Sequence, residues 1–138
     1  MSIVYNGGTY DMFHVGHAQF LERASYYGEV TIALNTDEFV KEFKGRAPVM
    51  NFAERYGVLS SCKYVSRVIP NISGADSKPT IVSVRPNIIV SGSDWEHKDY
   101  FKQMQFTQKW LDEHGIRLVY VPYTTNISST IIKKRLGI

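Results

Sequence analysis

The stretch GGTYDMFHVGH, residues 7–17, decides the fold of this chain, because it has the pattern of a turn from a strand into a helix. An apolar run, residues 3–5, precedes it, and residues 19–27 after it have helical periodicity. Such a turn directs free backbone N–H groups toward an anion, and the helix dipole adds positive charge there. His14 and His17 lie three positions apart at this helix end and share one face. The stretch therefore predicts a site at which a phosphate reacts.

The rest of the chain alternates short apolar runs with helical patterns. Alternation of this kind predicts a single-domain, Rossmann-like α/β fold over residues 1–138, with about five strands in a mainly parallel sheet and helices on both faces. The expected strands are residues 3–5, 30–34, 64–69, 87–90 and 117–121, and the expected helices are residues 19–27, 38–43, 52–62, 79–84, 98–114 and 131–136. The sequence contains no internal repeat and no linker, so we expect one domain.

The composition is that of an ordinary water-soluble globular protein. Hydrophobic residues make up 43% and charged residues 21% of the 138 residues, and the net charge is +3. This mild excess, without a long Lys/Arg run, does not favour nucleic acid as a partner. The single cysteine, Cys62, excludes a disulfide within the chain and is expected as a buried structural thiol. We find no apolar run of membrane-spanning length and no signal-peptide pattern, so we expect a cytoplasmic protein without a membrane partner.

Two further stretches are expected at the same sheet edge as the opening turn. Residues 91–95 follow the fourth strand, and residues 124–130 carry hydroxyl and amide side chains before the last helix. Ligands of open α/β sheets bind where the strands end. One hydroxyl of the later stretch is needed to cap the helix, and the others exceed what capping requires. We therefore expect a second phosphate cradle facing the first.

Two cations flank Gly45, and a third begins the next helix. Lys44 and Arg46 have two readings, a solvated turn or a loop that closes over phosphate. Asn51 is expected to cap the helix that follows. Arg55 lies in its first turn, where the helix dipole disfavours a cation, so the sequence predicts an anionic partner for Arg55.

The opening turn and its two histidines have other possible roles besides a site for a reacting phosphate. The opening turn lacks the Gly-Lys-Ser/Thr of a P-loop and the G-x-G-x-x-G of a dinucleotide site. His14 and His17 are spaced to chelate a metal, but no third ligand cluster accompanies them, so we expect no metal site built from protein side chains. A purely packing role suits one histidine better than two, because Gly16 between them removes a side chain where something must come close.

The motif His14-Val15-Gly16-His17 matches the HxGH signature, and the chain resembles the HIGH-type nucleotidyltransferases. Within this group the chain most resembles the glycerol-3-phosphate cytidylyltransferases of teichoic-acid and capsule precursor synthesis. The resemblance extends over nearly the whole chain and is carried by residues 35–39, 64–70, 92–98 and 124–130. The resemblance implies that CTP and glycerol 3-phosphate give CDP-glycerol and pyrophosphate. It also implies Mg²⁺ bound with the triphosphate and a homodimer.

The resemblance assigns three groups of residues. The catalytic residues would be His14, His17 and Lys44. The nucleotide-binding residues would be Gly8, Thr9, Tyr10, His14, Gly16, His17, Asp94, Trp95, Thr124, Ile127, Ser128, Ser129 and Thr130. The acceptor-binding residues would be Asp11, Lys44, Arg46, Arg55 and Lys78.

The chain departs from the family pattern at a few positions. Tyr123 stands where the family has an arginine, Ser129 replaces a threonine, and Ser66 and Ser93 replace acidic residues. Loss of a guanidinium removes a charge-assisted contact to phosphate. These differences leave the acceptor open between glycerol 3-phosphate and another small phosphate, such as phosphoethanolamine or a sugar phosphate. A catalytically idle nucleotide-binding domain is the remaining alternative.

Overall fold

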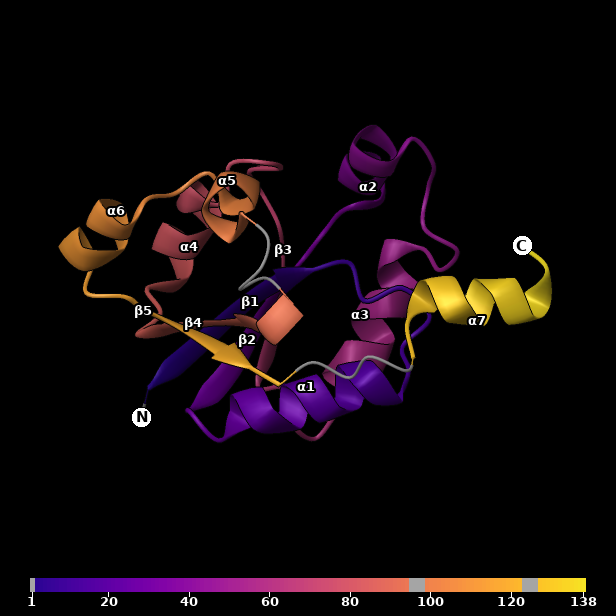
Figure 1. The fold of residues 1–138 in the computed structure, drawn as a ribbon, viewed down its shortest axis with the longest axis horizontal. Helices are drawn as coiled ribbons and strands as arrows, with labels where there is room; N and C mark the ends of the chain where they lie inside the picture. Colours follow the sequence, from indigo (N-terminus) through magenta and orange to yellow (C-terminus); the bar gives the residue numbers. More distant parts are fainter. Residues whose placement is uncertain (1, 95–98, 123–126) are drawn as a thin grey trace.

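Five parallel strands form one sheet in the order β3-β2-β1-β4-β5 (Figure 1), in a computed structural model that describes residues 2–94, 99–122 and 127–138. The strands are β1 (Ile3–Gly8), β2 (Glu29–Leu34), β3 (Arg67–Pro70), β4 (Ile88–Gly92) and β5 (Arg117–Val121). The helices are α1 (Val15–Ser25), α2 (Asp37–Lys44), α3 (Phe52–Ser60), α4 (Lys78–Val84), α5 (Tyr100–Met104), α6 (Gln108–Glu113) and α7 (Ser129–Leu136). The strand order reverses between β1 and β4, and the expected Rossmann-like α/β fold is confirmed.

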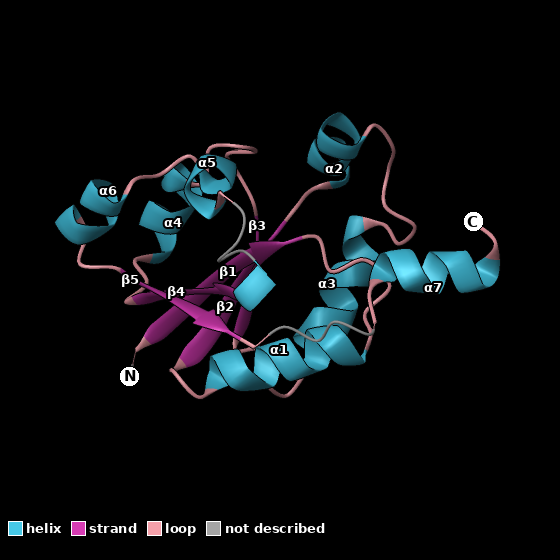
Figure 2. Cartoon of the chain, viewed as in Figure 1, coloured by secondary structure: helices cyan, strands magenta, loops and turns pink. Residues whose placement is uncertain are grey.

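Side chains of the central strands alternate between two hydrophobic cores, one on each face of the sheet. Val4 of β1 packs with Leu21 of α1 and Leu59 of α3 on one face. Tyr5, the next residue, packs with Ile81 of α4 and Leu111 of α6 on the other. Figure 2 shows the helices on both faces. Because both faces are covered, the strands are nearly continuous apolar runs, as the sequence indicated.

Helix α1 begins at Val15, four residues before the expected start at residue 19. His14 is its N-cap, so both histidines belong to the start of the helix. The prediction for α3 is confirmed, since Asn51 caps it and exchanges hydrogen bonds with Glu54 in a capping box. Thr36 caps α2, since its hydroxyl accepts a hydrogen bond from the Phe39 amide.

Two expected elements are corrected by the structure. The helix expected over residues 98–114 is two helices, α5 and α6, because Gln105 adopts a left-handed backbone with φ 59° and Thr107 caps the second helix. The strand expected over residues 64–69 is β3, Arg67–Pro70. The residues before it form a turn in which the Val65 amide donates to the Cys62 carbonyl. In the described part of the chain β3 pairs with β2 alone and is an edge strand, and an edge strand tolerates proline.

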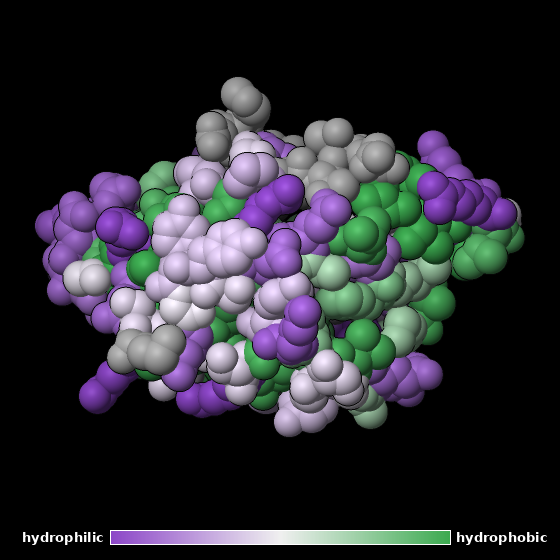
Figure 3. All heavy atoms as spheres, turned by 90° about the horizontal axis from the view of Figure 1, so that it is seen from below, coloured by the Kyte–Doolittle hydropathy of each residue, from purple (hydrophilic) through white to green (hydrophobic). Residues whose placement is uncertain are grey.

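Helix α7 stands apart from the two helix layers, at one end of the molecule (Figure 1). It contributes no buried residue to either core. Figure 3 shows hydrophilic residues gathered over the end formed by α6, and a mixture of hydrophobic and hydrophilic residues toward the α7 end. Among the described residues, no helix combines the length and the apolar character that crossing a membrane requires.

Candidate functional site

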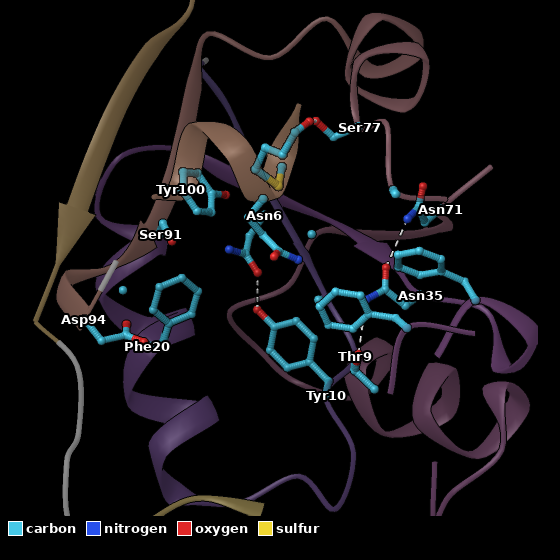
Figure 4. A pocket seen from close by; sticks show the side chains of 18 of the residues that line it. Asn6, Thr9, Tyr10, Phe20, Asn35, Asn71, Ser77, Ser91, Asp94 and Tyr100 are labelled. Carbon is cyan, nitrogen blue, oxygen red and sulfur yellow. Dashed lines mark hydrogen bonds between the residues drawn. The ribbon is translucent and has the colours of Figure 1, made fainter. Parts of the chain in front are cut away.

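A cavity of about 660 Å³ opens at the carboxyl end of the sheet (Figure 4). Its volume is in the range of small-molecule sites. The predicted site residues that line it are Gly8, Thr9, Tyr10, His14, Gly16, His17, Asp94, Ser128 and Ser129. The structure therefore brings together the opening turn, the end of β4 and the start of α7. Trp95, Tyr123 and Thr124 lie outside the described residues.

The opening turn is held in a rare backbone conformation. Tyr10 and Met12 both have positive φ, 52°, which non-glycine residues seldom adopt. The Tyr10 hydroxyl donates to the Asn6 Oδ1 at 2.6 Å, and the Asn6 Nδ2 donates to the Val90 carbonyl at 2.8 Å. These buried bonds tie the turn to β4. A strained backbone conformation of this kind is kept only where surrounding contacts hold it in place, and such positions cluster at functional sites.

His14 and His17 form the N-terminal cap of α1, and this fixes their protonation. The Gly16 amide donates to His14 Nδ1 at 3.0 Å, and the His14 amide donates to His17 Nδ1 at 3.1 Å. A ring nitrogen that accepts a hydrogen bond carries no proton, so each neutral imidazole carries its proton on Nε2. The two rings stack with centroids 3.8 Å apart. Both histidines line the cavity, and their Nδ1 atoms are used within the cap, so Nε2–H is the donor that each ring has left.

Both imidazoles stay neutral near pH 7. Burial lowers the pKa of His14 below its ordinary value. Burial, reinforced by the adjacent His14 ring, lowers the pKa of His17 to about 3, although Asp11 acts in the opposite direction. Near pH 7 these histidines are therefore neutral hydrogen-bond donors, the type of group that can form an oxyanion hole, and are not cations.

The pKa of His17 predicts a pH dependence of stability. Between pH 6.5 and about 3 the unfolded chain binds a proton at residue 17 that the folded chain does not. Stability rises with pH where the unfolded state holds more protons, so the free energy of unfolding should fall as pH decreases through this window. Urea denaturation at several pH values measures it. The variant His17→Asn should show a weaker dependence than the wild type, and equal slopes in the two proteins would contradict the assignment.

Gly16 makes room for the His14 ring. A Cβ at this position would lie 2.8 Å from His14 Cε1 and 3.2 Å from Ile127 Cγ2. The sequence indicated that something comes close to Gly16, and the structure identifies it as the histidine itself. Ile127, expected as a nucleotide-binding residue, packs beside this turn. Neither Ile127 nor Thr130 is among the residues that line the cavity.

Arg55 has the anionic partner that the sequence predicted. Its Nη2 donates to the Asp37 Oδ1 at 2.7 Å, and the side chain is fully buried. Its Nε donates to the Met50 carbonyl, and its Nη1 donates to the Thr9 and Asn35 carbonyls, at 2.8–2.9 Å. A buried side chain bonded in this way has no surface left for an acceptor. The acceptor-binding role expected for Arg55 is corrected to holding three loops of the site in place.

Asp11, predicted as an acceptor-binding residue, also holds a loop of the site in place. Its carboxylate accepts from the Val49 amide at 2.8 Å and the Met50 amide at 2.9 Å. Asp11 is 6% exposed, and it is not among the residues that line the cavity. The carboxylate holds the loop after α2 against the opening turn. These two hydrogen bonds fix the loop that follows Lys44 and Arg46 in the chain.

The three remaining predicted cations do not line the cavity. Lys78 forms an ion pair with Asp76 at 2.9 Å and donates to the Gln105 carbonyl. Its ammonium therefore links the loop before α4 to the residue that ends α5. Lys44 and Arg46 are exposed. Partial removal from water, together with repulsion from Lys133, lowers the pKa of Lys44. Lys133 of α7 therefore belongs to this group, although nothing in the sequence pattern singled it out.

An amide network on one wall was not predicted by the sequence. Asn35 Nδ2 donates to Thr9 Oγ1 at 3.1 Å, and Asn71 Nδ2 donates to Asn35 Oδ1 at 3.0 Å. Figure 4 shows this chain of contacts on one side of the cavity, with Ser91 and Asp94 on the other. The network joins the ends of β1, β2 and β3. A signal was available, since Asn35 and Asn71 each directly follow an apolar run that reads as a strand.

Residues 5–135 match the family model described as "Cytidylyltransferase-like". The chain belongs to the cytidylyltransferase-like family. Its cavity, with two neutral imidazole donors at a helix start, suits the phosphate chemistry of a nucleotidyltransferase, and the family supports that reaction class.

Named relatives cover most of this cytidylyltransferase-like chain. Glycerol-3-phosphate cytidylyltransferase of Bacillus subtilis (strain 168) is 33% identical over 99% of this chain and 98% of its own length. FAD synthase of Thermococcus sibiricus is 31% identical over 95% of this chain and 90% of its own length. A crystal structure of the lipopolysaccharide core biosynthesis protein from Thermoplasma volcanium GSS1 is similar, with a TM-score of 0.74, 25% identity, and coverage of 91% of this chain and 99% of that chain.

Proposed function

We propose that this cytidylyltransferase-like protein transfers CMP from CTP to glycerol 3-phosphate, giving CDP-glycerol and pyrophosphate. The pair of Nε2–H donors of His14 and His17 is the observation that carries the proposal. The full-length similarity to a protein named glycerol-3-phosphate cytidylyltransferase supports this acceptor. The similarity to a protein named FAD synthase makes other phosphate acceptors part of the test.

The proposed reaction needs no general base. A phosphate oxygen of the acceptor is already ionised, and it attacks the α-phosphorus of CTP in line. The new P–O bond forms as the bond to the pyrophosphate oxygen breaks, and no proton is transferred. Catalysis is then positioning and charge stabilisation. His14 and His17 would donate from Nε2 to the α-phosphate oxygens as charge builds. Lys44 and Arg46, which are exposed and do not line the cavity, would supply counter-charges for phosphate from the loop after α2.

Mg²⁺ is proposed to enter with the triphosphate. Among the described residues, no group of three or more metal-ligating side chains lies together. Asp11, the carboxylate near His17, is committed to two backbone amides. Mg²⁺ characteristically binds substrate phosphates with few protein ligands, and there it would neutralise phosphate charge. The residues present fit a cation carried on the nucleotide better than one held by the protein.

The test is pyrophosphate release from a matrix of nucleotides and acceptors. CTP, ATP, GTP and UTP are each combined with glycerol 3-phosphate, phosphoethanolamine, a sugar phosphate and FMN, with Mg²⁺ present. We expect release only with CTP, and the fastest release with glycerol 3-phosphate. Turnover with ATP alone would overturn the choice of CTP, and faster turnover of another acceptor would overturn glycerol 3-phosphate. Silence of the whole matrix would overturn the enzyme assignment in favour of an idle nucleotide-binding domain.

A further inference from the structure

Three polar side chains form a hydrogen-bonded row along one wall of the cavity (Figure 4). Thr9, Asn35 and Asn71 each directly follow a strand, β1, β2 and β3, and these three strands are neighbours in the sheet. The Arg55 Nη1 donates to the backbone carbonyls of Thr9 and Asn35, at 2.9 and 2.8 Å. The backbone beneath the row is therefore fixed, and the direction of each hydrogen bond decides what the row offers to a ligand.

The orientation of the Asn71 amide is set by the backbone around it. The Ser73 amide donates to Asn71 Oδ1 at 3.2 Å, and Asn71 Nδ2 donates to the Gly74 carbonyl at 3.0 Å. A backbone N–H can only donate and a backbone carbonyl can only accept, so these bonds identify the oxygen and the nitrogen of the side chain. The hydroxyl of the buried Thr80 is a second donor to the same oxygen, at 3.1 Å.

Asn71 imposes this direction on the rest of the row. Its Nδ2 donates to Asn35 Oδ1 at 3.0 Å, so the Asn35 nitrogen faces Thr9 and donates to Thr9 Oγ1 at 3.1 Å. A hydroxyl that meets an amide N–H accepts from it and keeps its own proton for another partner. Among the described residues, the bond from Asn35 is the only hydrogen bond of this hydroxyl. The Thr9 proton is therefore available to an acceptor in the cavity.

The neighbours of Thr9 indicate which ligand would take that proton. Thr9 belongs to the same turn as His14 and His17, and all three residues line the cavity. Each imidazole has an Nε2–H left to donate. Donors gathered in one turn match a group with several acceptor oxygens and negative charge, which is the chemistry of a phosphate. A hydroxyl held as a donor disfavours a ligand N–H at the same place.

We propose that Asn35 and Asn71 are positioning residues that hold the Thr9 hydroxyl as a donor to a phosphate oxygen of the substrate. The inference rests on the proposed function for the identity of that phosphate, which belongs to CTP or to glycerol 3-phosphate. Asn71 acts through Asn35 and Thr9, and its own amide is bonded to protein atoms.

The substitution Asn71→Asp reverses the row without changing its shape. The nitrogen becomes an oxygen, while the bonds from Ser73 and Thr80 are kept. The Asn35 amide then turns its nitrogen toward the new carboxylate and its oxygen toward Thr9. The Thr9 proton is now donated to Asn35 and is lost to the ligand. Asn35→Asp reaches the same end by a second route, because its carboxylate keeps the bond from Asn71 and takes the Thr9 proton.

The experiment is a double-mutant cycle read by isothermal titration, with CTP and glycerol 3-phosphate titrated separately so that nothing turns over. We expect Thr9→Val and Asn71→Asp each to weaken binding by about tenfold, the effect of losing one hydrogen bond to a charged group. Thr9→Ser should bind like the wild type. The double variant should bind within about twofold of Thr9→Val alone, because no hydroxyl is left to redirect.

The matched control is Asn87→Asp, which adds the same charge at an exposed position beside the start of β4. The Asn87 Oδ1 accepts from the Ile3 amide at 2.7 Å, and a carboxylate keeps this bond. We expect this variant to bind both ligands like the wild type. Thermal denaturation of every variant measures the fold, and Asn35→Asp replaces Asn71→Asp in the cycle if the latter does not fold.

The outcomes separate this inference from the proposed function. Effects that multiply in the double variant would overturn the inference, because Asn71→Asp would then act by its charge or through the fold. Unchanged affinity of Thr9→Val for both ligands would also overturn it. Weakened binding of one ligand alone supports it and identifies whose phosphate Thr9 contacts. If the cycle behaves as expected but no substrate pair releases pyrophosphate, the proposed function fails and the positioning of Thr9 stands.

Discussion

Replacement of His17 by asparagine is expected to lower kcat by about 10²–10³-fold while the protein stays folded. The asparagine side chain is short, so its oxygen can occupy the place of Nδ1 and accept from the His14 amide, which the histidine does at 3.1 Å. The cap of α1 is then kept, and only the Nε2–H donor is lost. Pyrophosphate release measures kcat, and thermal denaturation measures the fold.

The matched variant His17→Gln separates the two functions of this ring. Glutamine is longer, so its amide nitrogen reaches the place of Nε2 and its side chain does not reproduce the cap. We expect His17→Gln to retain more turnover than His17→Asn and to be less stable. If both variants unfold, His17 is a packing residue. If His17→Asn turns over like the wild type, the donor role is wrong.

Replacement of Arg55 by methionine is expected to destabilise the fold by about 3–5 kcal/mol, the cost of breaking a buried ion pair by removing one partner. The guanidinium is fully buried and bonds three backbone carbonyls besides Asp37. Methionine fills similar space but leaves these acceptors unpaired, and each unpaired buried group adds to the loss. Urea denaturation at neutral pH measures the free energy of unfolding.

The control for Arg55 is Arg67→Met on the exposed side of β3. This change removes the same charge from a solvated position, so we expect a change within about 0.5 kcal/mol. A similar small effect of Arg55→Met would show that the buried network contributes little. A large effect of Arg67→Met would show that net charge, not burial, governs the result. Because Arg55 holds the loops at Thr9, Asn35 and Met50, folded Arg55 variants should also bind CTP more weakly.

Local patterns predicted the central part of this molecule well. The opening turn lies between β1 and α1 as expected, and Ser128, Ser129 and Asp94 join it at one cavity. The residues of this turn interact over three or four positions, which a sequence displays directly. The start of α1 was placed too late because a histidine cap is not among the usual capping residues. The helix expected over residues 98–114 was too long because its periodicity continues across Gln105, whose backbone reverses.

The contacts of the charged side chains were predicted less well. Arg55 and Asp11 were both expected as acceptor-binding residues, and in the structure both are buried and hydrogen-bonded to the loops of the site. Their type and position matched the family pattern, but the pattern does not distinguish contact with a ligand from support of a loop.

By itself, the sequence determined the α/β class, the parallel sheet and the phosphate-type turn with its two histidines. These depend on periodicity and on neighbours within one turn or strand. Only the tertiary structure decided which charges meet. Ser129 reaches Asp11 across 118 residues, and Arg55 reaches Asp37 and Thr9 across 18 and 46 residues. Such pairs form where separate elements end at one sheet edge, and no local pattern records which side chains face inward there.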